Sequence, residues 1–103
     1  MHGVVMDLKL YISPDIAKKL KDKHSLYVSE VESVWANYNG ITLEDTREQH
    51  RTSPATMWFI AKSPTGRDLK IVYVPEDDIA YMRTAYDANA TEIWLYKKRG
   101  GII

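Results

Sequence analysis

Two apolar, β-rich runs joined by a short polar turn constrain the fold of this chain more than any other feature. Residues 57–62 read MWFIAK and residues 69–74 read LKIVYV, and the turn SPTGRD between them contains both proline and glycine. Runs of this length and composition, separated by residues that favour turns, are typical of a β-hairpin. We therefore expect an antiparallel pair of strands as the basis of the fold.

Further strands are indicated on both sides of this hairpin. Residues 4–12 alternate between apolar and mostly polar side chains, which is the pattern of a half-buried strand. The turn PEDD at 75–78 leads into another apolar run at 79–86, IAYMRTAY, which is expected to form the next strand. A short strand is also expected where the segment 43–55 begins, followed by an exposed loop.

Helices are predicted from their capping residues. Ser13 is expected to cap a short helix that has Pro14 at its first position and ends near Asp22. Ser29 and Glu32 have the spacing of a capping box, so a second helix is expected to begin there. Its apolar residues recur at the spacing of one helical face, and an Asn-Gly pair stops it.

A third helix is expected near the C-terminus, where Asn89 and Glu92 form another capping box and a Gly-Gly pair follows Lys98. The order of elements predicts an α+β fold with two N-terminal helices and a C-terminal helix on one face of an antiparallel sheet of about four strands. The length of 103 residues fits a single domain, residues 1–103. The side chains expected in the core include Trp35, Trp58 and Ile71.

The composition of the chain excludes some cellular environments and some kinds of chemistry for this protein. The chain has no cysteine, which excludes disulfides and thiolate zinc sites, and its three histidines lack the spacing of metal ligands. We therefore expect no metal and no cofactor. No apolar run has the length of a membrane span and the N-terminus lacks the features of a signal peptide, so a soluble, cytoplasmic protein without a membrane partner is expected.

The net charge of the chain argues against nucleic acid as a partner, whereas its pattern of cations and tyrosines argues for it. Fourteen basic and fourteen acidic residues give no net charge, whereas proteins that bind nucleic acid usually carry a basic excess. The predicted strands nevertheless interleave cations with tyrosines, a pattern that can hold a phosphate backbone and stack bases. The alternative is an ordinary solvated sheet face of mixed charge. The residues concerned are Arg67, Lys70, Arg83, Tyr73, Tyr81 and Tyr86.

The order and spacing of several short motifs resemble those of a known family. The motifs are Lys23-His24, the helix VSEVESVW, Glu44-Asp45-x-Arg47, TMWFIAKSPTGRDLKIVYV and YMRTAYDANATEIWLY. From about residue 18 to residue 96, the chain is similar to BrnT-family toxins of bacterial type II toxin–antitoxin pairs. The resemblance implies a RelE-like fold of the RelE/ParE superfamily and metal-independent cleavage of RNA.

The resemblance also implies which residues form the site. It places the site at Lys23-His24, Arg51, Gly66-Arg67 and the position of Tyr86. The chemistry of RNA cleavage suits His24 as the base, Arg51 and Arg67 as a clamp on the phosphate, and Tyr86 as a hydrogen-bond or proton donor. This chain has Thr84-Ala85-Tyr86 where the family has Ser-Ala-Arg, so a tyrosine stands at the position of a cation. The residues expected to bind RNA are Lys23, Lys70, Arg83 and His50.

The charged segment LEDTREQHR at 43–51 is expected to be a solvated connection whose last residues, His50 and Arg51, point into the cleft. The expected partners are RNA and a cognate antitoxin of the ribbon-helix-helix type. The alternative function is a non-enzymatic binding module of the same fold, which binds an antitoxin or poisons DNA gyrase.

Overall fold

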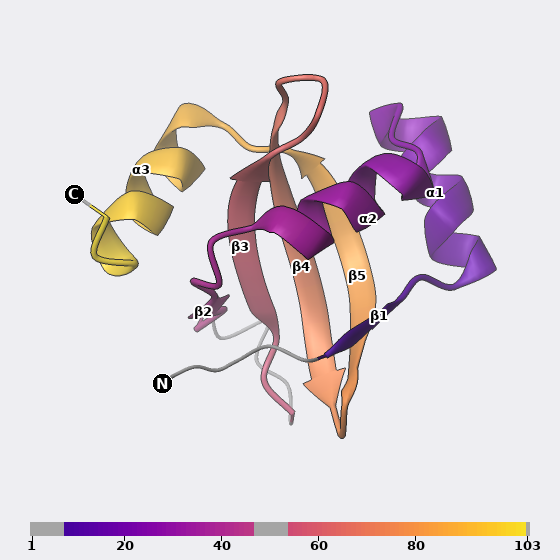
Figure 1. Cartoon of the computed structure of the whole chain (residues 1–103), viewed down its shortest axis with the longest axis horizontal. Coiled ribbons are helices and arrows are strands. Elements are labelled where there is room, and N and C mark those ends of the chain that lie inside the picture. Colours follow the sequence, from indigo (N-terminus) through magenta and orange to yellow (C-terminus); the bar gives the residue numbers. More distant parts are fainter. Residues whose placement is uncertain (1–7, 47–53, 103) are drawn as a thin grey trace.

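The computed structural model describes residues 8–46 and 54–102, which form an α+β fold (Figure 1). The predicted fold class is therefore confirmed. Within these ranges no helix is long and apolar enough to cross a membrane. The elements in chain order are β1 (Lys9–Tyr11), α1 (Pro14–His24), α2 (Val28–Asn37), β2 (Leu43–Glu44), β3 (Met57–Lys62), β4 (Asp68–Glu76), β5 (Ile79–Asp87) and α3 (Ala90–Arg99).

The sheet has five strands in the order β1-β5-β4-β3-β2, rather than about four, and it is mixed rather than antiparallel. β1 pairs in parallel with β5, and the other neighbours are antiparallel. The two outer strands are short, with three residues in β1 and two in β2. Short outer strands present few unpaired backbone groups at the edges of a sheet, which limits pairing with other chains.

The three central strands follow the predicted hairpins closely. Phe59 of β3 lies opposite Ile71 of β4, which in turn lies opposite Ala85 of β5. The turn between β4 and β5 is tighter than predicted, because Glu76 already pairs with Ile79. The two-residue loop between them places Asp77 at φ 57°, in the left-handed region that such hairpin turns require.

Two of the three predicted caps are present. The Ser13 hydroxyl accepts a hydrogen bond from the backbone N–H of Ile16 at 3.2 Å, and Asn89 forms the predicted capping box with Glu92. The capping box predicted for α2 is wrong, because that helix begins at Val28 and its cap residue, Tyr27, makes no side-chain hydrogen bond. The carboxylate of Glu30 in its first turn complements the helix dipole instead.

The helices cover both faces of the sheet, so the prediction that they share one face is wrong. Neighbouring residues of a strand point to opposite faces, and on β3 Phe59 contacts Trp35 of α2 whereas Trp58 contacts Tyr96 of α3. In Figure 1, α2 crosses the central strands, α1 lies beside β5, and α3 lies beyond β3. We call the face that bears Trp58 the outer face.

The core lies mainly between the sheet and the first two helices. Its largest fully buried side chains are Tyr73, Phe59, Leu20, Leu26, Leu69, Ile71, Val31 and Val34. Of the core residues predicted from the sequence, Ile71 and Trp58 are buried, and Trp35 is half-buried. The indole N–H of Trp35 donates to the carbonyl of Leu8 at 3.3 Å, which explains why this ring lies at the margin of the core.

Candidate functional site

A buried lysine marks the centre of the outer face. Lys70 lies on β4 opposite Tyr86 of β5, and only 9% of its side chain is exposed. Its ammonium lies 4.5 Å from the centre of the Trp58 ring and donates a hydrogen bond to Glu92 Oε2 at 3.0 Å. A buried ammonium requires a partner of opposite charge, and Glu92 supplies it from the first turn of α3.

Glu92 organises the contacts around this lysine. Its Oε1 accepts the backbone N–H of Asn89 at 3.0 Å, and its Oε2 accepts both the Lys70 ammonium and the Tyr86 hydroxyl, the latter at 2.9 Å. Burial alone would raise the pKa of Glu92, but these three hydrogen bonds together hold the pKa below its ordinary value. We call Lys70, Tyr86 and Glu92 the Lys70 triad.

The Tyr86 hydroxyl remains protonated near neutral pH. Burial raises its pKa, and the hydrogen bond that it donates to the Glu92 carboxylate raises the pKa further. The ring of His24, at the end of α1, lies with its centre 5.9 Å from the centre of the Tyr86 ring. The fold therefore brings together the Tyr86 hydroxyl on β5, the Lys70 ammonium on β4 and the His24 imidazole at the end of α1.

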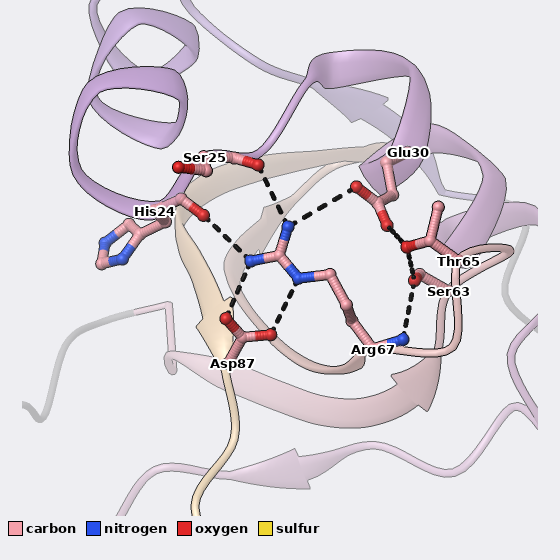
Figure 2. A network of polar contacts seen from close by, with 7 residues as sticks. All are labelled: His24, Ser25, Glu30, Ser63, Thr65, Arg67 and Asp87. Carbon is pink, nitrogen blue, oxygen red and sulfur yellow. Dashed lines mark hydrogen bonds and ion pairs between the residues drawn. The ribbon is translucent and has the colours of Figure 1, made fainter.

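Arg67 has a different environment from the one expected of a phosphate clamp (Figure 2). Its Nε and Nη2 donate to the two carboxylate oxygens of Asp87, at 2.9 and 2.8 Å. Nη2 also donates to the carbonyl of His24 at 2.9 Å, and Nη1 donates to the carbonyl of Ser25 at 3.0 Å. The guanidinium thus joins the β3–β4 turn, the end of β5 and the C-terminus of α1.

Charged neighbours complete this network. Glu30 of α2 lies 3.8 Å from Nη1 and also accepts a hydrogen bond from Thr65. Hydrogen bonds from Thr65 and Ser63, more than the nearby Arg67 charge, lower the pKa of Glu30. The hydrogen bond from Arg67 likewise lowers the pKa of Asp87. A phosphate could reach Arg67 only by displacing these contacts, so the geometry favours Arg67 as the residue that holds the His24 backbone in place.

Of the remaining predicted cations, two lie within the described ranges and two lie outside them. Lys23 and Arg83 are exposed and make no ion pair with another described residue, and His50 and Arg51 lie outside the described residues. Tyr73 is buried against α2, on the face opposite Lys70, so the predicted interleaving of cations and tyrosines on one face is only partly present. The outer face retains Lys70 and Tyr86.

Two residues of the site were missed as site residues from the sequence. Glu92 was predicted only as a helix-capping residue, and Trp58 only as a core residue. A signal for Glu92 was present, because a capping glutamate that follows a strand by a few residues can also reach side chains on that strand. The contact between Trp58 and Lys70 depends on the register of β3 and β4, which the sequence does not state.

A cavity of about 190 Å³ adjoins the Lys70 triad between α3 and the outer face. The residues that line it are Glu44, Asp45, Thr46, Trp58, Lys70, Glu92, Leu95 and Arg99. In the part of the chain that the structure describes, no group of three or more histidine and acidic side chains is placed to hold a metal ion. No protein-family model matches the chain, and no curated protein matches it either.

Proposed function

We propose that this protein is the toxin of a bacterial type II toxin–antitoxin pair and a ribonuclease that cleaves RNA without a metal ion. The observation that carries the proposal is the Lys70 triad beside the His24 ring. The BrnT-like order of the sequence motifs also supports the proposal, since it includes the pair Lys23-His24, whereas at Tyr86 the chain departs from the family.

Cleavage of this kind needs a base, a cation and an acid near one phosphate. The base takes the proton of the 2′-hydroxyl, whose oxygen attacks phosphorus, and the 5′-oxygen leaves as it gains a proton. His24 suits the role of base, because a ring nitrogen of neutral imidazole accepts a proton, whereas the lowered pKa makes Glu92 a weak base. Tyr86 suits the role of acid, because its raised pKa keeps the hydroxyl protonated.

Lys70 supplies positive charge where the phosphorane forms. Its ammonium carries three N–H donors, one of which it directs to Glu92, and we assign its remaining donor capacity to phosphate oxygens. Arg51 stays a proposed phosphate ligand, as does His50, and Lys23 and Arg83 add charge at longer range. In this arrangement, Arg67 positions His24 by binding its carbonyl.

The proposal includes a partner and a compartment. A toxin of this kind acts in the cytoplasm and is neutralised by an antitoxin, for which a ribbon-helix-helix protein encoded by the adjacent gene is expected. Co-expression of the two proteins should give a stable complex that does not cleave RNA.

A second function is favoured by one observation. The Arg67 guanidinium makes its hydrogen bonds to protein groups, which suits a protein of this fold that binds a partner, an antitoxin or DNA gyrase, without cleaving RNA. In that case the toxicity of the protein would not depend on His24 or Tyr86.

The test is cleavage of total RNA by the purified protein without added metal, with and without ribosomes. We expect Tyr86→Phe, Lys70→Met and His24→Ala each to lower the rate by roughly a hundredfold, the usual effect of removing a group that stabilises the transition state. Tyr11→Phe is the matched control, because Tyr11 is 49% exposed on β1 and its register partner Tyr81 lies five residues from Tyr86 along β5. Failure of the wild-type protein to cut RNA in either condition would reject the ribonuclease and favour the binding module.

A further inference from the structure

One carboxylate oxygen of the Lys70 triad accepts the hydrogen bonds that a bound phosphate would need. Glu92 Oε2 accepts the Lys70 ammonium at 3.0 Å and the Tyr86 hydroxyl at 2.9 Å. Lysine and tyrosine side chains that converge on one anionic oxygen are among the contacts by which proteins bind phosphate oxygens. The position of such an oxygen is therefore already filled by a side chain of the protein itself.

The start of α3 holds Glu92 in this position. Its other oxygen, Oε1, accepts the backbone N–H of Asn89 at 3.0 Å within the capping box, and the helix dipole favours a negative charge in the first turn. The side chain of Glu92 is 20% exposed and that of Lys70 is 9% exposed, so the pair interacts more strongly than a pair on the surface. An incoming phosphate meets a negative charge that is already bound to these donors.

We propose that the Glu92 carboxylate occupies a phosphate-binding position between Lys70 and Tyr86 and competes with the substrate for it. Tyr86 has a single O–H, so it cannot donate to Glu92 and to RNA at the same time. Lys70 has further donors, but a carboxylate and a phosphate on one ammonium repel each other. RNA must therefore displace Glu92 before cleavage. The inference rests on the proposed ribonuclease function and adds to it a contact that restrains the free protein.

The cavity beside the triad gives the displaced carboxylate a place to move. Glu92 itself lines this cavity of about 190 Å³, so rotation about its side-chain bonds can carry the carboxylate away from Tyr86 while α3 stays in place. Arg99, in the last turn of α3, also lines the cavity and makes no ion pair with another residue in the described ranges. Its positive charge favours a carboxylate in the cavity, whereas Asp45 there is buried and has a partner of its own.

Phosphate binding can be measured separately from cleavage. Inorganic phosphate is titrated into ¹⁵N-labelled protein at neutral pH and constant ionic strength. The indole N–H resonance of Trp58, assigned with Trp58→Phe, is the reporter, because the Lys70 ammonium lies 4.5 Å from the centre of this ring. We expect Glu92→Gln to bind phosphate roughly tenfold more tightly than wild type or better, because it removes the competing charge. Glutamine keeps the helix cap, since it serves in a capping box as glutamate does.

Three further variants locate the effect. Glu32→Gln is the matched control for net charge, because Glu32 is an exposed glutamate on α2, which covers the other face of the sheet, and its phosphate affinity should equal that of wild type. Lys70→Met added to Glu92→Gln should remove the gain in affinity, since the cation is lost. If Glu92→Gln does not fold because Lys70 loses its partner, Glu92→Asp takes its place. Aspartate keeps the charge but is shorter by one methylene, which draws the carboxylate away from Tyr86 and should still raise the phosphate affinity.

The outcomes separate this inference from the proposed function. A phosphate affinity that the change at Glu92 leaves at the wild-type value, or a gain that Lys70→Met does not remove, would overturn the inference even if the protein cleaves RNA. A gain that depends on Lys70, in a protein that cleaves no RNA, would support the occupied phosphate position and overturn the ribonuclease. When the protein does cleave RNA, Glu92→Gln should lower the KM for RNA, and an unchanged KM would overturn the competition between Glu92 and the substrate.

Discussion

Replacing Arg67 should destabilise the fold, although the residue lies in a turn that the sequence marks as surface. The guanidinium donates two hydrogen bonds to carbonyls at the end of α1 and two to the carboxylate of Asp87. Each carbonyl bond contributes about 1 kcal/mol. The ion pair adds about 0.5 kcal/mol, discounted because the Asp87 side chain is 61% exposed. The expected loss for Arg67→Ala is therefore about 2–3 kcal/mol.

The assay is thermal and urea unfolding of the purified variant beside wild type. For a domain of this size the loss corresponds to a decrease in Tm of roughly 10–20 °C. Arg67→Lys should lose most of the same stability, because an ammonium cannot reproduce the planar fork. Arg83→Ala is the matched control, since Arg83 is exposed on β5, and its effect should stay within about 0.5 kcal/mol.

Lowering the pH should reduce the difference in the free energy of unfolding between Arg67→Ala and wild type. The pKa of Asp87 is lowered in the folded protein by its hydrogen bond from Arg67. A lowered pKa contributes stability above the unfolded-state value, about 3.9 for aspartate, and this stability is lost as the pH falls through the folded-state pKa. Arg67→Ala removes every hydrogen bond that the guanidinium makes. If the variant nevertheless unfolds near neutral pH at the same temperature and urea concentration as wild type, the reasoning is refuted.

Further substitutions test other parts of the structure by urea unfolding at neutral pH. Tyr38→Phe should raise stability by roughly 1 kcal/mol, because it removes a buried hydroxyl that has no hydrogen-bond partner among the described residues; a loss of stability would show that the hydroxyl is satisfied. Ser25→Gly should raise it by about 0.5 kcal/mol, because Ser25 has φ 51° and glycine adopts this conformation without strain. Asn89→Ala should lower it by about 1 kcal/mol through loss of the α3 capping box, and no change would mean that Glu92 holds the helix end without it.

The central part of the fold was predictable because its signals are local. The two apolar runs and the turn between them specify β3 and β4, and Ser13 and Asn89 specify the starts of two helices. The outer strands were less predictable, since β1 and β2 depend on backbone pairing with distant strands rather than on their own composition. The position of α3 also escaped prediction, because strand alternation places apolar residues on both faces of β3.

From the sequence, the residues of the candidate site could be named in part, but their contacts could not be predicted. His24 and Tyr86 lie far apart in the sequence, and the resemblance indicated both, yet their contact depends on how α1 packs beside β5. Arg67 was expected to bind a phosphate because it matches the Gly-Arg of the hairpin in the resembled family and because a guanidinium can bind a phosphate with two hydrogen bonds. Its actual partners are two backbone carbonyls and a carboxylate, and a sequence does not show where helix-terminal carbonyls lie.

The cost of the Lys70–Glu92 pair is the strongest physical reason to look for function at the outer face. Desolvation of two charges offsets most of their attraction, so a buried ion pair is seldom the most stable choice for a position in a sheet. Ile60, the β3 neighbour of Lys70 across the ladder, shows that an apolar side chain fits this layer. A lysine at the facing position on β4 therefore adds little to the stability of the fold. Because it lies beside a cavity, a tyrosine hydroxyl and a histidine, this lysine instead provides a fixed positive charge. A site that binds phosphate needs such a charge held in place before the substrate arrives.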